Sequence, residues 1–66
     1  MTSKKNQAAA FAQNRLAIIR ELSNKVGVPM PEFDDKTAAM AIAVLAKLSG
    51  DEQMYKAGKA AMEALA

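Results

Sequence analysis

Two prolines divide this chain into separate helical parts. Pro29 and Pro31 stand two residues apart in a sequence that otherwise consists largely of residues favouring helices. Each proline lacks a backbone N–H donor and disfavours a helical conformation in the residue before it, so no helix continues through this segment. Alanine occupies 15 of the 66 positions, and aromatic residues are few. The sequence therefore predicts an all-α fold with a hinge at residues 27–34.

A long helix is predicted before the hinge, over about residues 4–26. Ser3 precedes it as an N-cap, and Gly27 follows it at the position where helices commonly end in a left-handed residue. Apolar residues recur along it at helical spacing, which indicates an amphipathic helix. Residues 1–26 also carry five lysines and arginines against one glutamate, so this helix is basic.

Two shorter helices are predicted after the hinge, over about residues 35–48 and 50–65. Asp34 or Asp35 is the expected N-cap of the earlier one. Ser49 and Glu52 have the S-x-x-E spacing of a capping box, which would start the last helix. The connection is then very short, and the two helices form a hairpin or a sharper corner.

The small size of the chain makes a sufficient core hard to build. A domain of 66 residues buries only about 60% of the surface of its unfolded form. Without cysteine or histidine it lacks disulfides and the usual zinc ligands, so we expect a homodimer or small homo-oligomer. Gly58 indicates close packing beneath the third helix. The second helix is apolar nearly all round, and the side predicted for self-association is formed by Ala39, Ala43 and Ala46.

The sequence contains no pattern typical of catalysis. Histidine and cysteine are absent, and no glycine-rich phosphate-binding motif occurs. The acids near the hinge lack the spacing of a calcium loop, so we predict no enzyme, no metal and no cofactor. The longest wholly apolar run, residues 38–46, has less than half of the roughly 20 residues that span a bilayer. We expect no membrane segment and a cytoplasmic location, or the host cytoplasm for a viral protein.

Arg15 falls near the middle of the apolar side of the first helix. A guanidinium group in such a place needs a partner if it is buried. In one interpretation, Arg15 extends along the core and reaches Glu32, Asp34 or Asp35. In the other, this part of the helix is uncovered, and Arg15 with Phe11 anchors a protein partner, because aromatic and arginine residues are common interface hot spots.

These observations favour a non-catalytic protein-interaction module that acts as a homo-oligomer. An adaptor, an inhibitor or an assembly factor would fit, as in phage and mobile-element accessory proteins. The predicted partner-binding residues are Phe11, Arg15, Ile18 and Arg20. The alternative is a small nucleic-acid-binding regulator that uses the basic first helix to contact phosphates and bases. Its predicted contact residues are Lys4, Lys5, Arg20, Asn24 and Lys25.

Overall fold

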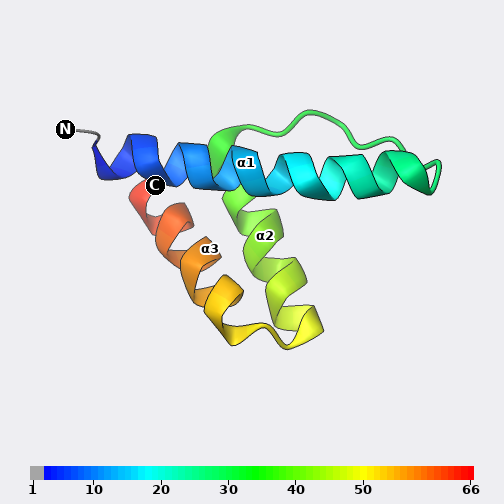
Figure 1. The fold of residues 1–66 in the computed structure, drawn as a ribbon. Coiled ribbons are helices and arrows are strands. Elements are labelled where there is room, and N and C mark those ends of the chain that lie inside the picture. Colours follow the sequence, from blue (N-terminus) through cyan, green and yellow to red (C-terminus); the bar gives the residue numbers. More distant parts are fainter. Residues whose placement is uncertain (1–2) are drawn as a thin grey trace.

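The structure, a computed structural model, describes residues 3–66 and consists of three α-helices joined by short segments. These are α1 (Lys4–Lys25), α2 (Asp35–Ser49) and α3 (Glu52–Ala64), with no strand in the described residues. In Figure 1, α2 and α3 form a hairpin that meets α1 along the N-terminal part of α1. The C-terminal half of α1 extends beyond the hairpin, and the hinge returns along it. The all-α, three-helix prediction is confirmed.

The N-caps of α1 and α2 agree with the sequence. The Ser3 hydroxyl accepts a hydrogen bond from the Asn6 N–H at 3.1 Å, and an Asp34 carboxylate oxygen accepts one from the Thr37 N–H at 2.7 Å. Hydrogen bonds from the Thr37 side chain and backbone hold the pKa of Asp34 below its ordinary value. Local side-chain chemistry therefore sets where both helices begin.

The start of α3 differs from the prediction. Ser49 is the last residue of α2, and its hydroxyl donates to the Ala46 carbonyl at 3.1 Å. Gly50 ends α2 in a left-handed conformation, with φ of +78°. Asp51 is the N-cap of α3, where its carboxylate accepts from the Met54 N–H at 3.1 Å. The predicted capping box is wrong because Ser49 is still helical and its hydroxyl is turned back onto its own helix.

The hinge lies partly on the core. Met30 and Phe33 are half-buried and pack against it. Val28, in contrast, is 59% exposed. Gly27 has a φ of +78°, which permits the sharp turn at the end of α1, and the Ser23 hydroxyl donates to the Val28 carbonyl beyond it. The turn therefore directs Val28 away from the hairpin.

The core consists mainly of small side chains. Leu16 and Ile42 are its largest fully buried members, and alanines from all three helices surround them. The two helices of the hairpin approach very closely, because a Cβ atom added to Gly58 would lie 2.9 Å from the Ala43 backbone nitrogen. This contact accounts for the glycine inside α3, and the prediction of close packing there is confirmed.

The alanine side of α2 faces into the protein. Ala39, Ala43 and Ala46 are only 0%, 6% and 4% exposed, all through contacts within the chain. The prediction that these alanines form a self-association surface is therefore wrong. These small residues do lie at a close contact between helices, but the partner helix is α3 of the same chain and not a helix of a second copy. Gly58 on α3 provides the matching small surface.

Candidate interaction surfaces

A row of large apolar residues on α2 stays between 45% and 81% exposed, away from the side that carries most of its buried alanines. Met40, Val44 and Leu48 recur every four residues and lie on one side of the helix. Val44 is 52% exposed and Leu48 is 81% exposed. α2 thus buries its alanines together with Ile42 and leaves Val44 and Leu48 largely outside, although burial of large apolar side chains is what normally stabilises a core.

These residues form one wall of a groove between α2 and α3, which we name the α2–α3 groove. The groove is an open hollow of about 320 Å³. Its α3 wall carries a second row at helical spacing, and Ala43 lies between the two walls. The residues forming the walls are Met40, Val44, Lys47, Leu48, Tyr55, Lys59 and Met62.

The charged residues lining the α2–α3 groove, within the described part of the chain, are both lysines. The Nζ atom of Lys47 lies 3.6 Å from a Glu52 carboxylate oxygen and 4.7 Å from the centre of the Tyr55 ring. Lys59 is exposed and forms no ion pair with any residue from 3 to 66. The groove therefore combines apolar walls with positive charge.

A second apolar surface lies on the part of α1 that extends beyond the hairpin. Ile18, Leu22 and Val26 recur every four residues, and their exposure rises from 50% at Ile18 to 75% at Val26. We name this row the α1 stripe. In contrast, Ala8 and Ala12 in the N-terminal half of α1 are buried beneath the hairpin. The stripe is exposed because α1 is longer than the surface that α2 and α3 offer it (Figure 1).

The predicted partner-binding residues are divided between two sides of α1. Phe11, Arg15 and Ile18 are spaced by four and three residues, which puts them on one side of the helix. Phe11 is half-buried, while Arg15 is exposed and borders a hollow between α1 and the hairpin. Arg15 forms no ion pair within residues 3–66, so of the two interpretations of this residue, the one that pairs it with the hinge acids is wrong.

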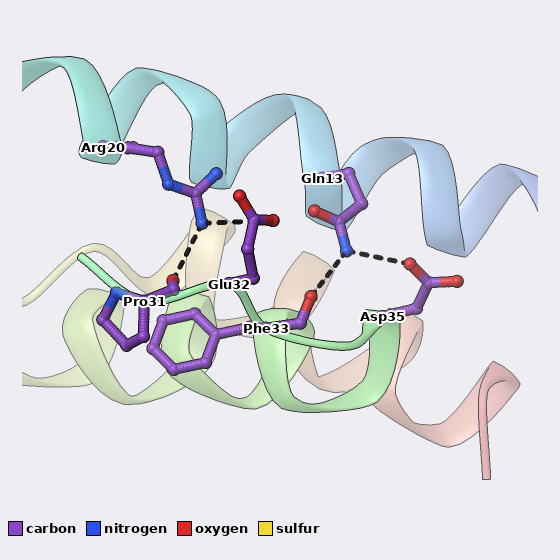
Figure 2. Close-up of polar contacts among 6 residues, drawn as sticks. All are labelled: Gln13, Arg20, Pro31, Glu32, Phe33 and Asp35. Carbon is purple, nitrogen blue, oxygen red and sulfur yellow. Dashed lines mark hydrogen bonds and ion pairs between the residues drawn. The ribbon is translucent and has the colours of Figure 1, made fainter.

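Arg20 takes the role that one interpretation assigned to Arg15. Its Nη2 atom donates to the Pro31 carbonyl at 3.0 Å and lies 4.0 Å from a Glu32 carboxylate oxygen (Figure 2). Two turns earlier on α1, the amide of Gln13 donates to the Phe33 carbonyl at 3.2 Å and to an Asp35 carboxylate oxygen at 2.9 Å. Arg20 and Gln13 thus attach the hinge to α1, which places Arg20 apart from Phe11, Arg15 and Ile18.

The residues predicted for nucleic-acid binding are not brought together. Lys4 and Lys5 lie at the start of α1, while Asn24 and Lys25 lie at its end. At 1.5 Å per residue the two groups are about 30 Å apart. Arg20 between them already interacts with the hinge carbonyl and with Glu32. The basic residues therefore do not form one patch.

Residues 3–66 contain no group of three or more acidic, histidine or cysteine side chains arranged to hold a metal ion. None of their helices is long and apolar enough to cross a membrane. No family model matches the chain, and comparisons with curated proteins and with solved structures find no match. The geometry of the surfaces is therefore the basis for a functional conclusion.

The α2–α3 groove was not predicted from the sequence, although a signal for it was present. On α2, Val44 and Leu48 lie away from the side that carries Ala39, Ala46 and Ile42. On α3, Gly58 and Ala61 supply a second small-residue side. Matching the small residues of the two helices would have predicted a close α2–α3 contact and left Val44 and Leu48 outside.

Proposed function

We propose that this protein is a non-catalytic helical interaction module that acts as a homo-oligomer. The observation that carries the proposal is the exposure of large apolar side chains. Within residues 3–66, eight of them are between 45% and 81% exposed. Monomeric globular proteins rarely expose large contiguous apolar patches, and such patches commonly mark interaction sites.

The α1 stripe is the surface we assign to self-association. A row of apolar residues at every fourth position can pair with an identical row from a second copy about a two-fold axis. Glu21 and Lys25 are exposed beside the stripe and carry opposite charges. Each of them can therefore face the opposite charge on a second copy. Burial of Ile18, Leu22 and Val26 in such a pair would supply the apolar core that a small domain lacks.

Sedimentation equilibrium over micromolar to submillimolar concentrations tests this proposal. We expect concentration-dependent assembly of the wild-type chain and a monomer for Leu22→Asp, because a carboxylate in the stripe would be buried without a partner. Leu48→Asp is the matched control, since Leu48 is also exposed but lies outside the stripe. A wild-type chain that stays monomeric over the whole range contradicts self-association.

A titration with random-sequence duplex DNA, at two salt concentrations, separates the proposal from the nucleic-acid alternative. Binding through phosphate contacts weakens steeply as salt rises. We expect no tight binding, because the lysines of α1 are divided between its two ends and Arg20 interacts with the hinge. Tight, strongly salt-dependent binding that is lost in a Lys4→Ala, Lys5→Ala double variant would favour the alternative.

A further inference from the structure

We infer that the α2–α3 groove binds an amphipathic helix of a protein partner, and that acidic residues flank the apolar stripe of that helix. This inference rests on the proposed function, since it names the partner class of an interaction module. It assigns the groove a different occupant from the α1 stripe. Its support comes from the shape of the groove, its charge and the packing beneath it.

The shape of the α2–α3 groove suits a helix. Val44 and Leu48 on one wall, and Tyr55 and Met62 on the other, stand at helical spacing on two neighbouring helices. A helix laid in such a groove inserts its own apolar residues at i, i+3, i+4 and i+7 between the walls. Met40 and Met62 have flexible side chains that adapt to an incoming surface.

The charge of the groove distinguishes between a partner and a second copy. Lys47 and Lys59 line the groove, and Lys59 has no ion-pair partner within residues 3–66. Two copies joined groove to groove would bring four lysines into one interface, and like charges oppose such association. Glutamates or aspartates beside the apolar stripe of a partner helix would instead pair with these lysines.

The packing beneath the groove holds it open in one shape. Ala43 and Gly58 bring the backbones of α2 and α3 into contact, so the helices cannot move closer to close the groove. The ion pair between Lys47 and Glu52 and the contact of Lys47 with Tyr55 further link the two walls. A groove formed before binding loses less conformational freedom when a ligand enters.

A designed peptide tests the inference directly. The probe is a blocked, labelled helix of about 16 residues, with leucines at i, i+4, i+7 and i+11 and glutamates beside them. The matched peptide carries lysines in place of the glutamates. By fluorescence anisotropy, we expect the glutamate peptide to bind at least about tenfold more tightly, with a difference that shrinks as salt rises. Equal affinity for the two peptides, or binding of neither, overturns the inference.

Two pairs of variants locate the binding. Val44→Asp is expected to weaken binding of the glutamate peptide about tenfold. Val28→Asp, at a similarly exposed valine on the hinge, is expected to leave binding unchanged. Lys59→Glu is expected to make the lysine peptide bind more tightly than the glutamate peptide. Lys56→Glu, on the same helix but outside the groove, is expected to preserve the preference for the glutamate peptide. All four positions are exposed, and circular dichroism verifies that each variant folds. Equal effects within either pair contradict a site in the groove.

Other occupants give distinct results. If Val44→Asp abolishes concentration-dependent assembly, a second copy fills the groove and the inference is overturned, while homo-oligomerisation stands. Loss of binding to phosphatidylglycerol vesicles in Val44→Asp would overturn it in favour of a lipid surface. If the chain assembles through the α1 stripe but binds neither peptide, the inference is overturned and the proposed function stands. Peptide binding by a chain that stays monomeric supports the inference and removes the homo-oligomer from the proposed function.

Discussion

The inner and outer faces of the α2–α3 hairpin differ in how closely their side chains let the two helices approach, although Ile42 gives the inner face one large residue. On the inner face, alanines of α2 meet Gly58 and Ala61 of α3, and the backbones come into contact. On the outer face, Val44 and Leu48 stand half or more exposed. Close backbone approach at Ala43 and Gly58 therefore buries small residues on one side of α2 while Val44 and Leu48 stay outside. These two large residues are consequently available for binding.

The strongest test of this contrast removes one large apolar side chain from each face of α2. Ile42→Ala deletes a side chain that is 2% exposed and leaves a cavity, so we expect a loss of about 3 kcal/mol in the free energy of unfolding. Leu48→Ala on the outer face should change it by less than about 0.5 kcal/mol. Urea denaturation followed by circular dichroism measures both. Similar losses for the two variants would mean that the outer face is covered.

A second test fills the close contact between the two helices. Gly58→Val places a side chain where even a Cβ would meet the Ala43 backbone, so we expect a loss of about 2 kcal/mol. Ala60→Val, on the exposed side of the same helix, should cost less than about 1 kcal/mol through helix propensity. The same denaturation experiment compares them. A Gly58→Val variant as stable as Ala60→Val would contradict direct backbone contact.

The smallest expected effect on stability concerns the N-terminus of α2, the helix that carries both the inner and the outer face. The pKa of Asp34 in the folded state lies below its ordinary value of 3.8, so its ionised form stabilises the fold. That contribution is fully present above 3.8 and is lost as the pH falls through the lowered pKa. Asp34→Asn retains an N-cap without a titrating group and should flatten this acid dependence. Denaturation curves between neutral and strongly acidic pH measure it, and an unchanged dependence in Asp34→Asn would contradict the role of the carboxylate.

Local features of the fold could be predicted from the sequence to within a few residues. The ends of α1 and the start of α2 are set by Ser3, Gly27 and Asp34. These residues work through hydrogen bonds or a backbone conformation that involve only nearby residues. The candidate surfaces were harder to predict, because they depend on which helix faces meet. The exposed position of Arg15 and the attachment of the hinge by Arg20 illustrate this, since both arginines lie on the same helix and either could have reached the hinge acids.

The amino-acid sequence alone sets the number of helices, the break at the two prolines and the absence of cysteine and histidine. These properties follow from backbone chemistry and residue type, which no distant contact alters. The packing of the three helices was needed to establish that the alanines of α2 face inward and that Val44 and Leu48 remain outside. Because α2 is apolar on both sides, its own periodicity is ambiguous. The close approach permitted by Gly58 on α3 resolves that ambiguity.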